Sequence, residues 1–227
     1  MCENGQVNGI TRNGGYAEYC SLRHEAAVRI PEGIDAAKYA PILCAGVTVF
    51  NAMRLQRLPP GSTVAVQGLG GLGHLAIQYA AKSGYRTVAL SRDDKKAKFA
   101  QELGAHEYID ASKDDTVEEL QKLGGADLII CTAPSAEAIG PLLHGLAIQG
   151  KLLIVAVAGE IPFDTVKMLQ KGLSVTSWPS GNARDAEEAI QFTALQGVDC
   201  VIEKFPLEKA NEAYGEFCFP LVSVMVC

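Results

Sequence analysis

The stretch Ser62-Thr63-Val64-Ala65-Val66-Gln67-Gly68-Leu69-Gly70-Gly71-Leu72-Gly73 joins a short apolar run of the β type to a helical pattern that follows at once. Its glycines have the Gly-x-Gly-x-x-Gly spacing of a loop that holds the pyrophosphate of a dinucleotide. Gly68 permits a tight turn, Gly70 lets the phosphates approach the backbone, and Gly73 lets the helix pack closely on the strand. The helix N-terminus adds N–H groups and a partial positive charge that attract the anion.

Runs of the strand type and helical patterns alternate from Ser62 onward. The runs are mostly continuous and apolar, which is typical of a parallel sheet covered by helices on both faces. The sequence predicts strands over residues 62–67, 86–91, 107–110, 127–132, 151–157 and 173–178. Six strands with interleaved helices predict an α/β fold, a doubly wound parallel sheet of the Rossmann type.

Helical patterns lie before, between and after these strands. Asp93 or Asp94 is placed to cap the helix that ends at Gly104, and Pro206 lies near the start of the last helix. The spacing predicts helices over residues 36–55, from Leu72 to a stop near Gly84, and over residues 93–104, 135–147, 184–195 and 206–214.

The composition is that of a folded protein with a sizeable core. The 227 residues are 48% hydrophobic and 20% charged, and the formal net charge of −6 disfavours nucleic acids and anionic membranes as partners. Charges or glycines interrupt every apolar run before it is long enough to span a bilayer. The first five residues lack the basic and apolar regions of a signal peptide, so we expect a cytoplasmic location.

The cysteines and histidines form no complete metal site by spacing. The seven cysteines are odd in number and irregularly spaced, which indicates thiols or metal ligands rather than a disulfide framework. The four histidines, His24, His74, His106 and His144, stand singly, and such residues are more often surface or core residues than ligands. His74 follows the glycine loop, so contact with a cofactor is an open alternative for it.

The end of the second predicted strand bears on which nicotinamide cofactor fits. An NAD enzyme of this fold places a carboxylate there to accept from the ribose 2′-OH, but this position is Ser91. Arg92 and Lys96 follow, and they could bind a 2′-phosphate through charge-assisted hydrogen bonds. We therefore predict NADP(H). Two alternatives stay open: Asp93 reaches back to the ribose, or Asp93 and Asp94 only cap the next helix.

Several sequence blocks occur in one order along nearly the whole chain, in addition to the glycine loop. They are Cys2-Glu3-Asn4, Asn13-Gly14-Gly15-Tyr16-Ala17-Glu18-Tyr19, Ile30-Pro31-Glu32-Gly33, Leu43-Cys44-Ala45-Gly46-Val47-Thr48-Val49, Glu102-Leu103-Gly104-Ala105 and Phe205-Pro206-Leu207-Glu208-Lys209-Ala210. In these blocks the chain resembles the zinc-dependent, medium-chain alcohol dehydrogenases, and it is most similar to their cinnamyl-alcohol-dehydrogenase-like branch. Blocks in order are far more specific than a lone glycine motif.

The resemblance implies a catalytic role for two residues and a structural role for a third. Cys44 matches a ligand of the catalytic zinc, and a thiolate suits Zn²⁺; the alternative is a small buried thiol. Thr48, one helical turn later, matches a position that contacts the cofactor near the nicotinamide. Cys2 matches the last of four cysteines that hold a structural zinc. We expect the other ligands of both sites to be absent from this chain, which lacks the N-terminal part of the catalytic domain.

The resemblance also implies a cofactor pocket. Its members are the loop residues Gly68, Leu69, Gly70, Gly71 and Leu72, the strand-end residues Ser91, Arg92 and Lys96, the pair Thr132 and Ala133, the run Ala156, Val157 and Ala158, and Thr48. The pair and the run would border the adenosine ribose and the nicotinamide, where ligands of open α/β sheets bind. Tight strand packing would select the same small side chains.

The resemblance implies three segments. These are residues 1–45, a remnant of the catalytic (GroES-like) domain; residues 46–180, the NADP-binding Rossmann domain; and residues 181–227, a C-terminal return segment. Residues 217–227 are apolar and differ from the basic ending of the family.

The function implied is an alcohol dehydrogenase or aldehyde reductase. It would transfer hydride between NADP(H) and a primary alcohol or aldehyde with zinc as a Lewis acid, and we expect this to be impaired in the chain. The expected partner chain is a second copy, which would form a homodimer through the edge strand at 173–178. One alternative is a form that binds NADP(H) or pairs with another subunit without catalysis. A zinc-free quinone reductase is another, against which Cys2 and Cys44 argue.

Overall fold

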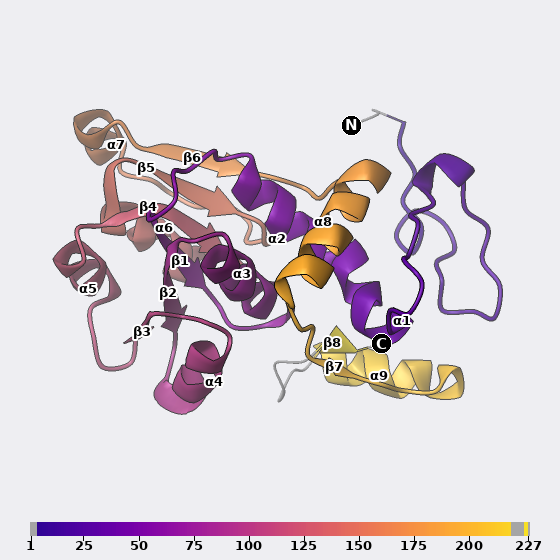
Figure 1. Ribbon diagram of the computed structural model, residues 1–227. Coiled ribbons are helices and arrows are strands. Elements are labelled where there is room, and N and C mark those ends of the chain that lie inside the picture. Colours follow the sequence, from indigo (N-terminus) through magenta and orange to yellow (C-terminus); the bar gives the residue numbers. More distant parts are fainter. Residues whose placement is uncertain (1–3, 219–224, 227) are drawn as a thin grey trace.

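Six parallel strands form one sheet in the order β3-β2-β1-β4-β5-β6. The computed structural model describes residues 4–218, 225 and 226, and Figure 1 shows the sheet on the left. The order reverses between β1 and β4, which confirms the predicted doubly wound arrangement. The strands are β1 (Thr63–Gln67), β2 (Arg86–Ser91), β3 (Glu107–Asp110), β4 (Ala126–Cys131), β5 (Leu146–Ile154) and β6 (Ser174–Ser177).

Helices cover both faces of the sheet because side chains alternate along each strand. In β1, Val64 and Val66 pack into one core and Ala65 into the other. The first core is closed by α2 (Ala45–Arg54), α3 (Gly71–Lys82), α4 (Ala97–Glu102) and α8 (Ala183–Gln196). The second is closed by α5 (Thr116–Lys122), α6 (Ala136–Leu142) and α7 (Thr165–Lys171).

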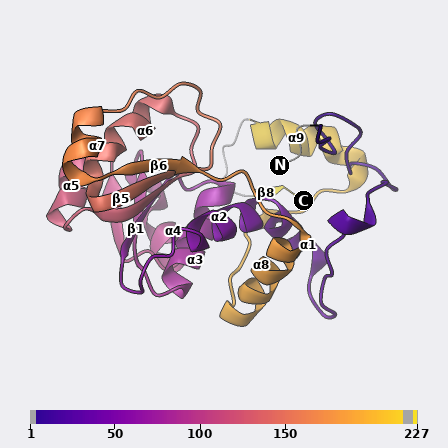
Figure 2. The same ribbon diagram turned by 90° about the horizontal axis from the view of Figure 1, so that it is seen from above.

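The remaining elements lie beyond α2 and α8, away from the sheet, as Figures 1 and 2 both show for α9 and the N-terminal segment. They are α1 (Ala36–Tyr39), β7 (Ile202–Glu203), α9 (Ala210–Cys218) and β8 (Met225–Val226), which pairs with β7. Short 3-10 turns span His24–Ala26, Ala40–Leu43, Asp94–Lys96, Leu143–Gly145 and Leu207–Lys209. Cys2 and most of the atypical C-terminal end lie outside the described residues.

The predicted helix over residues 36–55 is interrupted. Its first part is α1 followed by the 3-10 turn Ala40–Leu43, and its second part is α2. Pro41 lies at the start of the turn and has no N–H to donate to the preceding helical turn. Cys44 then leaves helical geometry, with φ −124° and ψ −77°, so that α2 begins directly after this cysteine.

The region before β5 also differs from the prediction. The predicted helix over residues 135–147 ends at Leu142, and β5 begins at Leu146, whereas the prediction begins this strand at residue 151. Leu146 pairs with Ala126, and the register then shifts before Leu128 pairs with Lys151. Gln149 takes a positive φ of 60° within this irregular part. An apolar run that pairs across such a bulge has no simple period of two.

Two short helices were not predicted. Asp115 is the N-cap of α5, and Asp164 is the N-cap of α7. Each carboxylate accepts hydrogen bonds from two N–H groups of the first turn. An N-terminal cap of this kind satisfies donors that the helix itself cannot. Among the described residues, no helix is both long and apolar enough to cross a bilayer.

A buried hydroxyl pair joins α3 to α8. The Tyr79 hydroxyl lies 2.8 Å from Oγ1 of Thr193, and both side chains are almost fully buried. The Tyr79 ring packs edge-on against Phe50 of α2 and Phe192 of α8. Burial raises the pKa of Tyr79 well above its ordinary value, so the hydroxyl stays neutral at physiological pH. This contact fixes α8 beside the helix that follows the glycine loop.

We expect Tyr79→Phe to lower the free energy of unfolding by about 1–3 kcal/mol, because the Thr193 hydroxyl would be left buried without its partner. Urea unfolding measures this loss. Thr193→Val should cost a similar amount, and the double variant should cost clearly less than the sum. Tyr85→Phe is the control, since the Tyr85 hydroxyl is only partly buried and its bond to Leu58 is 3.4 Å long. Additive losses would contradict the coupling.

Candidate functional site

Two glycines of the loop between β1 and α3 are required by the packing of the chain itself. A Cβ at Gly73 would lie 1.9 Å from the carbonyl oxygen of Gly68. Gly68 has a φ of +93°, and a Cβ there would lie 2.9 Å from the side chains of Thr132 and Ala133. Because no side chain fits at either position, the start of α3 can lie directly over the carboxyl end of β1.

The glycine between them faces open space. No atom lies within 4 Å of the position that a Cβ at Gly70 would take. Gly70 is the N-cap of α3 and offers no side chain to the first turn, whose helical bonding begins with the N–H of His74 donating to Gly70. The N–H groups of Gly71, Leu72 and Gly73 therefore have no intrahelical acceptor. This cradle fits the pyrophosphate of a dinucleotide.

Residues at the end of β4 support the loop. The N–H and the hydroxyl of Thr132 both donate to the carbonyl oxygen of Gln67, each at 2.9 Å. The Gln67 side chain in turn accepts from the N–H of Ala133 at 3.2 Å. The structure thus brings the predicted residues Thr132 and Ala133 to the glycine loop. The motif did not reveal the role of Gln67, although a polar residue ends the otherwise apolar strand β1.

The predicted cationic residues lie beside the same loop. Nζ of Lys96 donates to the carbonyl oxygen of Leu69 at 3.2 Å, although the two residues are 27 positions apart. Partial burial, and next the positive charge of Arg92, lower the pKa of Lys96. Ser91 ends β2. The carboxyl end of β2 therefore presents a hydroxyl and two cations next to the loop.

The nearby carboxylates have other partners. Asp93 caps the turn Asp94–Lys96 by accepting from the N–H of Lys95 at 3.1 Å, and Asp94 pairs with Lys113. Of the two alternatives for these carboxylates, capping is confirmed for Asp93. The hydroxyl of Tyr108 holds the main chain here by donating to the carbonyl oxygen of Asp93.

Cys44 lies directly before α2, and Thr48 lies one turn later on that helix. The Thr48 hydroxyl donates to the carbonyl oxygen of Cys44 at 2.7 Å, and Cys44 is exposed, so the buried-thiol alternative is wrong. Protein zinc sites take three or four protein ligands. Among the described residues, no group of three or more His, Cys, Asp or Glu side chains is placed to hold a metal ion. The described residues therefore do not fit a complete zinc site, and Cys44 offers one thiol.

The run after β5 lies at the same edge of the sheet. β5 ends at Ile154, and Ala156, Val157 and Ala158 follow it. The Val157 side chain is 95% exposed, whereas Ala158 packs against the second core. Val157 is thus accessible at the carboxyl edge of the sheet, where the resemblance implies a cofactor contact.

His74 is a core residue. Its side chain is fully buried, Nδ1 lies 3.3 Å from the carbonyl oxygen of Gly70, and Nε2 accepts from the N–H of Val201 at 3.2 Å. Burial lowers the pKa of His74, so the ring is neutral and serves as a link between α3 and the segment before β7.

Asn51 and Ser180 were not predicted from the sequence. The Asn51 side chain donates to the carbonyl oxygen of Ser180 at 3.1 Å, and the Thr48 hydroxyl lies 3.4 Å from Oγ of Ser180. Asn51 is almost fully buried, between the apolar residues Phe50 and Ala52 of α2. Such a polar residue within an apolar run was the signal that could have identified the contact.

Relatives and solved structures resemble the chain along most of its length. It is 64% identical over 215 residues to the alcohol dehydrogenase patD of Penicillium expansum, covering 95% of this chain and 63% of that protein. It is 34% identical over 216 residues to an alcohol dehydrogenase of Geobacillus stearothermophilus, covering 94% and 64%. The chain thus spans less than two thirds of the length of these relatives.

The fold comparison agrees. The crystal structure of an alcohol dehydrogenase from Aeropyrum pernix matches with a TM-score of 0.90 at 28% identity, covering 99% of this chain and 68% of that one. A cinnamyl alcohol dehydrogenase from Sorghum bicolor matches with a TM-score of 0.79 at 28% identity, covering 88% and 57%. The sequence profile of the family described as "Zinc-binding dehydrogenase" matches residues 71–204, more than half of the chain. The chain belongs to the zinc-binding dehydrogenase family.

Proposed function

We propose that this chain carries the NADP(H)-binding part of an alcohol dehydrogenase that interconverts a primary alcohol and an aldehyde. The observation that supports the cofactor best is the open cradle at Gly70 with Lys96 and Arg92 beside it and no carboxylate at position 91. The names of the relatives support the reaction, since several are alcohol dehydrogenases.

Each part of the crevice has its own role in this proposal. The N–H groups at the start of α3 bind the pyrophosphate, and Arg92 and Lys96 bind the 2′-phosphate with Ser91 beside them. Thr48 and the run after β5 border the nicotinamide. When bound, NADPH supplies the hydride that reduces the carbonyl carbon of the aldehyde.

The proposal assigns one ligand to each of two zinc sites, a catalytic site and a structural site. We propose Cys44 as one ligand of a catalytic zinc, and Cys2, outside the described residues, as one ligand of a structural zinc. We derive no step from either metal, because the described residues complete neither site.

A second candidate function is NADP(H) binding and subunit pairing without catalysis. It is supported by the residues that the structure describes, which place no further His, Cys, Asp or Glu ligands around Cys44 for a metal ion. β6 lies at the edge of the sheet, with Ser174 and Ser177 exposed, and an edge strand can pair with the same strand of a second copy. A homodimer through β6 stays a prediction in both functions.

Gly70→Ala is expected to weaken NADPH binding at least about tenfold while leaving thermal stability unchanged. The added methyl group meets no protein atom, so it should occupy only space meant for the phosphates. Titration calorimetry and a thermal melt measure the two effects. Gly15→Ala is the matched control, since Gly15 also has nothing within 4 Å of its Cβ position but lies far from the loop in sequence. An unchanged dissociation constant would contradict the cradle.

The choice of cofactor can be tested at the end of β2. Arg92→Ala should weaken NADPH binding roughly tenfold and leave NADH binding unchanged, because only NADPH carries the 2′-phosphate. Ser91→Asp should reverse the preference, since a carboxylate repels that phosphate. Lys95→Ala is the control, because the Lys95 side chain is 82% exposed and its charged contact is with Asp93. Tighter binding of NADH than of NADPH by the unaltered chain would overturn the choice.

We expect the chain of 227 residues to bind NADPH but to reduce an aromatic aldehyde little or not at all, because its described residues give zinc only Cys44. Loss of NADPH absorbance, followed with benzaldehyde and added zinc chloride, measures turnover, and calorimetry measures binding. Substantial zinc-dependent turnover would contradict this expectation and exclude the second candidate function. Failure to bind NADPH would contradict both functions.

A further inference from the structure

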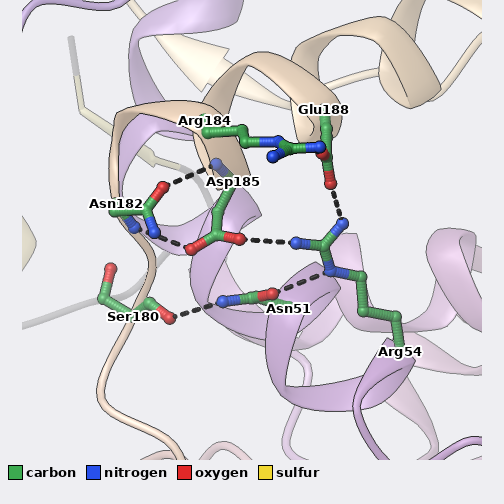
Figure 3. A network of polar contacts seen from close by, with 7 residues as sticks. All are labelled: Asn51, Arg54, Ser180, Asn182, Arg184, Asp185 and Glu188. Atoms are coloured by element: carbon green, nitrogen blue, oxygen red, sulfur yellow. Dashed lines mark hydrogen bonds and ion pairs between the residues drawn. The ribbon is translucent and has the colours of Figure 1, made fainter.

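A polar network joins α2 to the segment between β6 and α8, as Figure 3 shows. At its centre is Arg54 of α2, which donates to Oδ1 of Asn51 at 2.8 Å, to Oδ1 of Asp185 at 2.5 Å and to Glu188. Its guanidinium also lies 5.1 Å from the centre of the Phe50 ring. One side chain thus bonds to its own helix and to two carboxylates of α8.

The same network fixes the place where α8 begins. Asn182 and Asp185 form a reciprocal capping box: the N–H of Asn182 donates to Oδ2 of Asp185 at 2.9 Å, and the N–H of Asp185 donates to Oδ1 of Asn182 at 3.0 Å. Asp185 therefore bonds Arg54 with one oxygen and the start of α8 with the other. Arg54, and next Arg184, lower the pKa of Glu188, so this carboxylate is ionised at neutral pH.

The segment before α8 is pressed onto α2. A Cβ at Gly181 would lie 2.5 Å from Cγ2 of Val47. Next to it, the carbonyl oxygen of Ser180 accepts from Asn51, and the Ser180 hydroxyl lies 3.4 Å from the Thr48 hydroxyl. A continuous chain of contacts therefore runs from α8 through Arg54, Asn51 and Ser180 to Thr48.

The contact of Ser180 with α2 lies at a place in the sheet that bears on cofactor binding. A doubly wound sheet binds the two halves of a dinucleotide on either side of the point where the strand order reverses, outside the carboxyl ends of its strands. The glycine loop and the cations at the end of β2 lie on one side. Ser180 follows the carboxyl end of β6, on the other side, where the nicotinamide half belongs.

We infer that Asn51 and Arg54 are positioning residues for the nicotinamide half of the cofactor site, an inference that rests on the proposed function. Arg54 orients the Asn51 amide by donating a hydrogen bond to its oxygen, which turns the amide nitrogen toward Ser180. Asn51 then holds Ser180 against α2, and Ser180 keeps the Thr48 hydroxyl in place on the helix that begins directly after Cys44. Neither Asn51 nor Arg54 needs to touch the cofactor.

The test separates the two halves of the cofactor. Asn51→Asp keeps an acceptor for Arg54 but cannot donate to the Ser180 carbonyl oxygen. We expect this variant to bind NADPH about tenfold more weakly and to bind adenosine 2′,5′-bisphosphate, which lacks the nicotinamide, within about twofold of the unaltered chain. The fluorescence of bound NADPH, which reports the surroundings of the nicotinamide, should change as well.

Two further variants supply a second test and a control. Ser180→Ala removes only the hydroxyl contact with Thr48 and should weaken NADPH binding about threefold. This variant tests the inference if Asn51→Asp does not fold. Arg184→Ala is the matched control: Arg184 bonds Glu188 in the same network, its side chain is 87% exposed, and the network drawn in Figure 3 joins it to neither Asn51 nor Ser180. It should leave the binding of both ligands unchanged.

The outcomes are distinct. Selective loss of NADPH affinity in Asn51→Asp or Ser180→Ala supports the inference. Equal loss of both ligands would assign the network a general structural role, and no loss of either would leave it without a role in binding; both results overturn the inference alone. If the unaltered chain binds neither ligand, the proposed function fails, and the inference fails with it.

Discussion

The close approach of α3 to β1 determines where the other parts of the candidate site lie. With only hydrogen at the α-carbon of Gly73, the backbone of α3 can sit against the Gly68 carbonyl oxygen, where a methyl group would lie 1.9 Å away. This approach places the open N–H groups of α3 at the point where the strand order reverses. Thr132 and Gln67 then tie the end of β4 to the same turn. The open N–H groups at the start of α3 therefore follow from packing before any cofactor binds.

The sheet could be predicted from the sequence because its central strands are continuous apolar runs buried on both faces. The parts that could not be predicted depend on local breaks in that pattern. Gln149 adopts a positive φ inside an apolar stretch, and Cys44 leaves helical geometry after Pro41. Both breaks are changes of backbone geometry, which a period of two or of 3.6 residues does not identify.

The candidate site likewise has one part that the sequence predicts and another that it does not. The glycine spacing predicts the pyrophosphate cradle, because Gly68 and Gly73 each meet a steric demand and Gly70 leaves open space within a few residues of chain. Ser180 and Asn51 meet only across 129 positions of sequence, and their contact depends on how α8 packs on α2. No local motif records such a contact. Only a buried amide in an apolar helix hints that a distant acceptor must exist.

The groups at the end of β2 differ in chemistry from those beyond the end of β6, and this difference bears on the orientation in which a dinucleotide would bind. At the end of β2, Lys96 is partly buried beside Arg92, and both burial and that neighbouring charge lower its pKa. Two cations held together in this way favour an anion between them, such as a 2′-phosphate. On the other side, the Ser180 hydroxyl beyond the end of β6 lies beside the Thr48 hydroxyl of α2, and in the proposed function these groups border the nicotinamide. Under that proposal, a dinucleotide with its phosphate-bearing adenosine at β2 places the 2′-phosphate beside the cations, whereas the reversed orientation places no phosphate there.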